Sequence, residues 1–245
     1  MTTNIYVFVR FFREERHRDS FLRGDLYMNR LRYFRDYEEK GTGNIGDQNE
    51  GVHTWLQPQD AAIIIWDEET GEEQRIDGFV APSSISNRRF YDYHVYCMSA
   101  LYLKDEDRFD SSEALQAALM PFLDTGDLGD YCVAIPAESF IERLESAFNA
   151  DPKLAESFGH DLVSYYDPAT FSGAFTQNDA IFMKQISYSH QREYRIYAYN
   201  NTTGADGRTI NIGPLSDIAT VLSKTELRTS LVLDDDLAMY IRNPA

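Results

Sequence analysis

The chain has 245 residues and a formal net charge of −17, with 40 Asp and Glu against 23 Lys and Arg. This length suits one domain with a sizeable core, and the 16 Tyr, 15 Phe and 2 Trp exclude a globally disordered chain. The longest apolar run has 6 residues, 61–66, far fewer than the roughly 18–20 of a membrane span, so we expect no membrane contact. The two cysteines form no disulfide framework, which favours a cytoplasmic protein with reduced thiols.

The negative charge is concentrated in the middle of the chain. Residues 1–40 hold 9 basic and 7 acidic side chains, a net charge of +2, and residues 181–245 hold 7 of each. Residues 41–87 carry a net charge of −8 and residues 88–180 a net charge of −11. An acidic surface repels phosphate, so an anion site should draw on the two ends of the chain.

The first third of the chain predicts short strands and one hairpin. Residues 5–12 are β-branched and aromatic, which is typical of a strand. LYMN predicts a short strand and LRYFRDYEE a helical turn, and glycine-rich residues 40–51 predict a loop. Residues 61–65 and 74–76 flank DEETGEE, which predicts a hairpin with an acidic tip. We expect this hairpin to aid solubility and to protect a sheet edge.

The remaining chain predicts further strands with two helices between them. A helix should begin at Ser111-Ser112-Glu113 and end or kink at Pro121, and a second should begin at Pro136. The other expected elements are strands at 92–100, YCVAI, HDLVSYY, 192–199, ADGRTINIG and TSLVL. Since strands and helices do not alternate regularly, we expect an α+β fold with a mostly antiparallel sheet. It would form a single domain, residues 1–245, with 101–160 as a helical insertion or flank.

The common catalytic motifs are missing from this sequence. It has no phosphate-loop fingerprint, no H-E-x-x-H, no C-x-x-C and no G-x-S-x-G, and its five histidines are scattered. We therefore expect no metal site. Three polar positions on predicted strands remain as candidates.

Strand alternation assigns each candidate to a face. Arg10 shares a face with aromatic residues, where it would either grip a phosphate or carboxylate, pair with a core carboxylate, or reach water at the strand end. Ser99 lies near the end of the predicted strand HVYCMSA, and a serine at a strand end is by itself ordinary and implies no function. Gln191, Glu193 and Arg195 share one strand face, and the plainer interpretation is a Glu–Arg pair facing solvent.

Together, the strand arginine, strand-end serine and Gln-x-Glu resemble the arginine–serine–glutamate signature of the ADP-ribosyltransferases. The resemblance implies a split antiparallel sheet and NAD as substrate, with Arg10 holding the phosphates. It implies that Ser99 orders the glutamate and the nicotinamide ribose, and that Glu193 stabilises the oxocarbenium ion. Gln191 would bear on target choice. The chemistry agrees, because breaking the glycosidic C–N bond develops positive charge that a fixed carboxylate stabilises.

A broader likeness covers more of the chain. FLRGDLYMNRLRYFRDYEE, GDQNEG, FMKQISYSHQREYRI and IGPLSDIA resemble a widespread set of poorly characterised bacterial and phage proteins suspected of toxin or defence roles. Tyr188 could stack on a nicotinamide or a base, although packing in the sheet is the plainer interpretation. Three arginines of the first of these segments could meet a ligand phosphate or form a solvated face: Arg30, Arg32 and Arg35.

The sequence therefore favours an NAD-dependent ADP-ribosyltransferase that modifies a protein or nucleic acid, as a bacterial toxin or anti-phage effector. An antitoxin or chaperone could accompany it. One alternative is a non-enzymatic acidic protein that mimics nucleic acid and occupies the basic groove of a partner. A weaker alternative is a metal-dependent nuclease using Asp47, Glu50 and Glu193.

Overall fold

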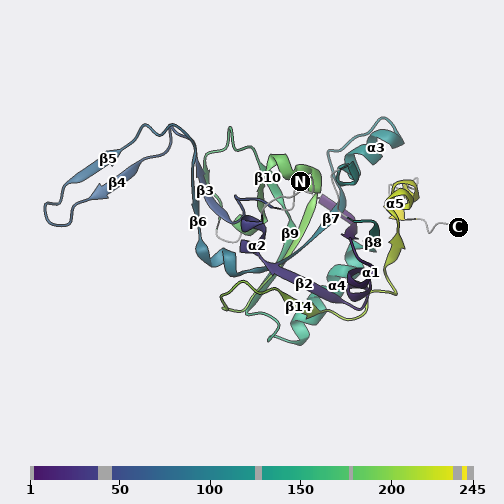
Figure 1. Ribbon diagram of the computed structural model, residues 1–245. Coiled ribbons are helices and arrows are strands. Elements are labelled where there is room, and N and C mark those ends of the chain that lie inside the picture. Colours follow the sequence, from purple (N-terminus) through teal and green to yellow (C-terminus); the bar gives the residue numbers. More distant parts are fainter. Residues whose placement is uncertain (1–2, 38–45, 125–128, 177–178, 234–238, 242–245) are drawn as a thin grey trace.

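The structure, a computed structural model, describes residues 3–37, 46–124, 129–176, 179–233 and 239–241 (Figure 1). Its centre is an antiparallel sheet in which β7 pairs on one edge with β1 and β2 and on the other with β13. The strands of this sheet are β1 (Thr3–Phe12), β2 (Asp25–Arg30), β7 (His94–Lys104), β8 (Tyr131–Pro136), β9 (Ser157–Leu162), β13 (Glu193–Tyr199), β14 (Arg208–Asn211) and β15 (Thr220–Leu222).

Smaller pairings surround this sheet. A three-stranded sheet consists of β3 (Val52–Leu56), β6 (Ser83–Ser86) and β11 (Gly173–Ala174), and β4 (Ile63–Trp66) and β5 (Glu73–Ile76) form a hairpin. A parallel pair consists of β10 (Ser164–Tyr166) and β12 (Met183–Gln185), and a C-terminal antiparallel pair consists of β16 (Leu231–Leu233) and β17 (Met239–Ile241). The helices are α1 (Glu15–Leu22), α2 (Leu31–Asp36), α3 (Ser112–Leu119), α4 (Ala137–Ala150), α5 (Lys224–Ser230) and the 3-10 turns η1 (Arg88–Asp92), η2 (Pro121–Asp124), η3 (Asp179–Phe182) and η4 (Ile186–Gln191).

The main sheet splits along one edge of β7. The last pair that β1 makes with β7 is Val9 with Ser99, and β2 joins the same edge further along, where Asn29 pairs with Val95. Beyond Val9, β1 leaves β7 and continues its ladder with β8, so Arg10 stands opposite Val133. The opposite edge of β7 is unbroken, because β13 pairs along it from Ser99 to His94.

Each face of the sheet has its own apolar packing. One face buries side chains such as Phe8 and Tyr194 against α1 and α4, which contribute Phe21 and Phe140. Along α4, Phe140, Leu144 and Phe148 recur at the spacing of one helix face, and all three are buried.

The other face is covered in two parts. Residues of α3, η2 and α5 pack on the β1–β8 half, around Val9 and Leu101. A separate cluster that includes Leu31, Phe90 and Val95 packs near β2 and the far end of β7. Ser99 of β7 and Glu193 and Arg195 of β13 lie on this second face.

The predicted fold class is confirmed in its coarse form, α+β with mostly antiparallel strands. The predicted strand at TSLVL is partly wrong, because residues 229–230 end α5 before β16 begins. The predictions omitted α1, whose only buried residue is Phe21, and the short strands β3 and β6. Residues 101–160 contain α3 and α4, and also β8, which lies inside the main sheet.

Two local signals in the sequence act as expected. The Ser111 hydroxyl accepts a hydrogen bond from the Ala114 amide at 3.1 Å and so caps α3. Residues 63–66 and 73–76 pair as the predicted hairpin. Within the described ranges, no helix has the length and apolarity that crossing a bilayer requires.

Candidate functional site

Strand pairing brings Ser99 and Glu193 together. They are direct cross-strand neighbours in the β7–β13 ladder, and Cys97 faces Arg195 two residues further on. Side chains alternate across a strand, so these four residues share the second face of the sheet. The Ser–Glu half of the sequence signature therefore has its side chains side by side, with Ser99 partly buried and Glu193 only 5% exposed.

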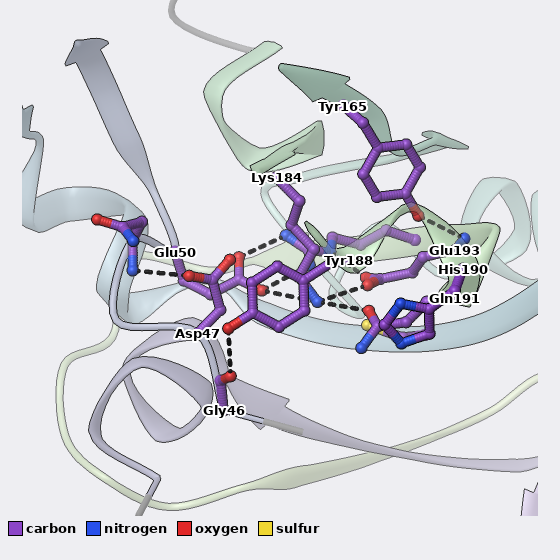
Figure 2. A network of polar contacts seen from close by, with 12 residues as sticks. Gly46, Asp47, Glu50, Tyr165, Lys184, Tyr188, His190, Gln191 and Glu193 are labelled. Carbon is purple, nitrogen blue, oxygen red and sulfur yellow. Dashed lines mark hydrogen bonds and ion pairs between the residues drawn. The ribbon is translucent and has the colours of Figure 1, made fainter. Parts of the chain in front are cut away.

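Four buried charged residues, Glu50, Lys184, Glu193 and Arg195, form what we call the charge cluster (Figure 2). Arg195 donates its Nε to Glu193 at 2.7 Å and both terminal nitrogens to Glu50 at 2.8 and 2.9 Å. Lys184 Nζ lies 2.9 Å from Glu193 Oε2 and 3.4 Å from Glu50 Oε1. Two carboxylates thus face two cations, which balances the formal charge and meets the condition for burying it.

Glu193 and Lys184 keep their charged forms. Burial alone would raise the pKa of Glu193, but Arg195 and Lys184 outweigh it and hold that pKa well below its ordinary range. Burial would likewise lower the pKa of Lys184, yet Glu193 and Glu50 raise it above its ordinary value. Glu193 therefore stays a carboxylate at any physiological pH.

Neighbouring polar groups complete the hydrogen bonding around Glu193. The Glu193 backbone N–H donates to Tyr165 Oη at 2.9 Å, and the Cys97 thiol bonds the carboxylate. Burial, with a further contribution from Glu193, raises the pKa of Cys97 to about 12, so this thiol stays protonated and unreactive. Gln191 accepts from Lys184 Nζ at 2.9 Å, which ties the Gln-x-Glu pair to one ammonium group.

The backbone between Gln191 and Glu193 adopts an uncommon conformation. Arg192 has a φ of 45°, in the left-handed region that non-glycine residues seldom occupy. Its guanidinium lies 3.8 Å from the Tyr102 ring centroid and donates to the carbonyls of Ala100 and Tyr102. These contacts hold the turn by which η4 enters β13 and thereby set the position of Glu193.

Asp47 is a second buried carboxyl group close to the cluster. Burial, followed by repulsion from Glu50, raises its pKa to about 6. One oxygen accepts the Asn49 amide at 2.8 Å, while Oδ2 has no hydrogen-bond partner in the described part of the chain. Asp47 and Glu50 reach this position through a tight turn that ends at Gly51, whose φ of +72° disfavours other residues.

Arg10 lies on the opposite face of the sheet from Glu193. Its strand neighbours Phe8 and Phe12 belong to the cluster under α1 and α4, and its guanidinium lies 5.0 Å from the Tyr96 ring centroid. Its Nη1 donates to the Cys97 carbonyl at 2.6 Å, at the point where β1 has left β7. Arg10 therefore provides a hydrogen-bond donor for the Cys97 carbonyl where β1 and β7 separate, and its side chain does not join Ser99 and Glu193.

Tyr188 connects the charge cluster with a cavity. Lys184 Nζ lies 5.0 Å from the Tyr188 ring centroid, and Tyr188 Oη donates to the Gly46 carbonyl at 3.0 Å (Figure 2). The cavity has a volume of about 870 Å³. It is lined by Arg35, Asp36, Tyr37, Gly46, Gln48, Asn49 and Tyr188.

Of the three arginines considered as phosphate ligands, Arg35 lines this cavity. Arg30 is buried and donates to the carbonyls of Asp92 and Thr202. Arg32 is paired with the Asp92 carboxylate. Arg35 packs its guanidinium 4.8 Å from the Tyr91 ring centroid, which orients it at the cavity wall.

The metal-dependent alternative finds little support in this geometry. Arg195 and Lys184 occupy the space between Glu50 and Glu193 that a cation would need. Among the described residues, no three His, Cys, Asp or Glu side chains are arranged to hold a metal ion.

The sequence predicted a solvent-facing Glu193–Arg195 pair as the plainer alternative, and that interpretation is wrong because Arg195 is 1% exposed. The sequence analysis also did not identify Lys184, whose position after the apolar FM of FMKQ was a weak signal of burial.

No family model, curated protein or solved structure matches the chain.

Proposed function

We propose that the protein is an NAD-dependent ADP-ribosyltransferase that modifies a protein or nucleic acid. The observation that carries the proposal is the direct pairing of Ser99 with Glu193 on one face of a split antiparallel sheet. Gln191, two residues before Glu193, is hydrogen-bonded to the same lysine. The serine and the Gln-x-Glu are residue types that the sequence resemblance implies. Two features differ from that expectation, because Ser99 lies inside β7 and not at its end, and Arg10 lies on the other face of the sheet.

The reaction follows from the proposed roles. The bond between ribose C1′ and the nicotinamide nitrogen breaks, and nicotinamide leaves with the bonding electron pair. A nucleophilic atom of the target then forms the new bond to C1′ and gives its proton to water or a nearby base. Glu193, fixed as a carboxylate, stabilises the positive charge that develops on the ribose, because a preorganised charge needs no rearrangement.

Ser99 orients the nicotinamide ribose and Glu193, beside which it lies. Tyr188 stacks on the nicotinamide ring from the cavity side, where its ring is within 5.0 Å of Lys184. We further propose that Arg35 takes the phosphates, because it lines the cavity while Arg10 is engaged on the other face. Gln191 contributes to the choice of target.

The remaining roles rest on the wider resemblance. Likeness to toxin- and defence-associated bacterial and phage proteins supports action inside a bacterial cell, in conflict with a competitor or a phage. An antitoxin or chaperone partner belongs to the same proposal.

Transfer of label from NAD to macromolecules in a bacterial lysate tests the proposal. Native protein should label a discrete product, and Glu193→Gln should reduce labelling by roughly 10²-fold or more. Since Glu193 is buried among charges, Ser99→Ala provides a second variant that leaves the charge cluster intact. It should lower labelling by roughly tenfold, while Ser164→Ala, at an exposed serine of β10, leaves it unchanged.

Two arginine variants assign the phosphate contact. If Arg35 holds the phosphates, Arg35→Ala raises the KM for NAD with little change in kcat, because it removes a binding interaction. Arg10→Ala should instead lower stability by loss of its bond to Cys97. Absence of any labelled product and of any NAD consumption would eliminate the transferase.

The alternative is a non-enzymatic acidic protein that occupies a basic groove. The net charge of −19 over residues 41–180 favours it, as does the complete pairing of Glu193 with two cations. It predicts a salt-sensitive complex with a basic protein, at an affinity that Ser99→Ala leaves unchanged.

A further inference from the structure

The hairpin formed by β4 and β5, residues 63–76, presents apolar side chains to solvent. Ile63, Ile64, Ile65 and Trp66 are 50%, 56%, 48% and 61% exposed, and Ile76 is 41% exposed. The hairpin projects away from the rest of the molecule in Figure 1. Single exposed apolar residues are ordinary, whereas contiguous exposed apolar groups are typical of surfaces that contact another molecule.

The register of the hairpin divides these residues between two faces. Ile63 pairs with Ile76 and Ile65 with Gln74, so Ile63, Ile65 and Ile76 share one face that carries no charge. We call this the isoleucine face. Ile64 and Trp66 lie on the other face beside Arg75 and Glu73. Since an isolated two-stranded hairpin is marginal in water, an apolar partner surface would also stabilise it.

The base of the hairpin is anchored firmly in the fold. Trp55 Nε1 donates to the Pro168 carbonyl at 3.0 Å, and Gln57 Nε2 donates to the carbonyls of Pro168 and Phe171 at 2.8 Å. Strand β3, which leads into the hairpin, is also paired on both edges, with β6 and β11. The fold thus holds the stem in place while it leaves the isoleucines uncovered.

The negative charge around the hairpin indicates the charge of a partner that could bind it. Residues 52–86 contain seven Asp or Glu and one Arg, a net charge of −6. Most of these carboxylates surround the tip, in DEETGEE. A second copy of a chain with a net charge of −17 would be repelled, and so would an acidic protein. Complementarity therefore favours a basic partner.

We propose that the isoleucine face docks into an apolar groove, rimmed by Lys or Arg, on a partner protein. The isoleucines fill the groove, and the carboxylates of the tip pair with its basic rim. This inference is independent of the proposed transferase chemistry, because none of the residues assigned to NAD lies in the hairpin.

A defined peptide tests the surface. A fluorescent 18-residue amphipathic helix of leucine and lysine offers an apolar stripe between basic edges, and its leucine–glutamate counterpart offers the same stripe between acidic edges. The basic peptide should bind native protein in the micromolar range, detected by fluorescence anisotropy, and should bind at least about tenfold more tightly than the acidic one. Raising the salt concentration should weaken the complex.

The deciding variant is the triple change Ile63→Thr, Ile65→Thr and Ile76→Thr. Threonine keeps the β-branched shape, so circular dichroism and the melting temperature should stay near native values. Affinity for the basic peptide should fall at least about tenfold. Val221→Thr, at a 45% exposed valine on β15, should leave affinity within about twofold.

Three outcomes would overturn the proposal. They are no binding up to about 100 μM peptide, equal affinity of native and triple-variant proteins, or preference for the acidic peptide. Sedimentation adds a separate check, because self-association that the triple variant abolishes would make a second copy the occupant. The triple variant should keep native NAD consumption, so failure of either proposal can be told apart from failure of the other.

Discussion

The charge cluster and the hairpin invert the usual distribution of residues between interior and surface. Inside, Glu193 and Arg195 are 5% and 1% exposed, whereas outside, Ile64 and Trp66 are 56% and 61% exposed. The cluster is held by contacts among segments far apart in the chain: the turn before β3, strand β12 and strand β13. The hairpin is held by its own strand pairing. Tertiary contacts therefore fix the first region, and a partner would complete the second.

The largest expected effect is the loss of one cation from the cluster. Arg195→Met should lower the free energy of unfolding by about 3–5 kcal/mol, because it leaves the two buried carboxylates of Glu50 and Glu193 with Lys184 as the one remaining cation of the cluster. Urea denaturation at neutral pH measures this change.

The matched control uses the arginine of the hairpin. Arg75 pairs with Asp77 at 3.2 Å, but both side chains are largely exposed. Arg75→Met should change the unfolding free energy by less than about 0.5 kcal/mol. Equal losses in the two variants would show that burial does not distinguish the regions.

A smaller effect, with a defined pH dependence, is expected at Asp47. Its pKa is about 6 in the folded protein and about 3.9 when unfolded, so the native state binds more protons between these values. Stability from this group therefore falls as pH rises from about 4 to 6. Asp47→Asn should be more stable than the native protein by about 1–3 kcal/mol above pH 6, with no difference below pH 4.

Melting temperatures across this pH range check the sign. Asp67 at the hairpin tip also accepts backbone amides, but these bonds lower its pKa. Asp67→Asn should therefore be less stable than the native protein above the unfolded pKa, the opposite direction. A pH-independent difference for Asp47→Asn would refute the assignment.

The smallest effect is expected where isoleucine is exposed. Ile63→Thr in the hairpin should change stability by less than about 0.5 kcal/mol, since little apolar area is lost from the interior. Ile196→Thr on β13, a fully buried position, should cost about 2–4 kcal/mol. Thermal unfolding of both variants compares them, and a comparable loss for Ile63→Thr would mean that the hairpin packs on the protein itself.

Local patterns in the sequence predicted helices and strands better than they predicted which side chains are buried. Alternation correctly put Glu193 and Arg195 on one face of β13, and the β7 register then aligned Ser99 with Glu193. Alternation could not show that this face is buried, because Glu50 and Lys184, which cover it, come from distant segments. The apolar run at residues 61–66 is a similar case, since a hydrophobic strand usually indicates burial, whereas Ala61 is buried and residues 63–66, which form β4, are exposed.

Arg10 is a second residue whose surroundings residue alternation could not predict. Alternation correctly grouped it with Phe8 and Phe12, but three strands must be placed before its face can be compared with that of Glu193. The split of the sheet also depends on how β1 and β2 share one edge of β7, which is a long-range pairing. Such pairings lie outside what residue periodicity encodes.

The proposed NAD site is tested most directly by protein-detected NMR during a titration with NAD. Backbone amide resonances of Ser99, Gln191 and Glu193 should shift progressively with NAD, and the same positions should shift far less in Arg35→Ala at equal ligand concentration. Adenosine alone should leave the Ser99 and Glu193 resonances in place. An absence of shifts at these residues with millimolar NAD, or shifts confined to another part of the chain, would contradict the assignment of this face as the NAD site.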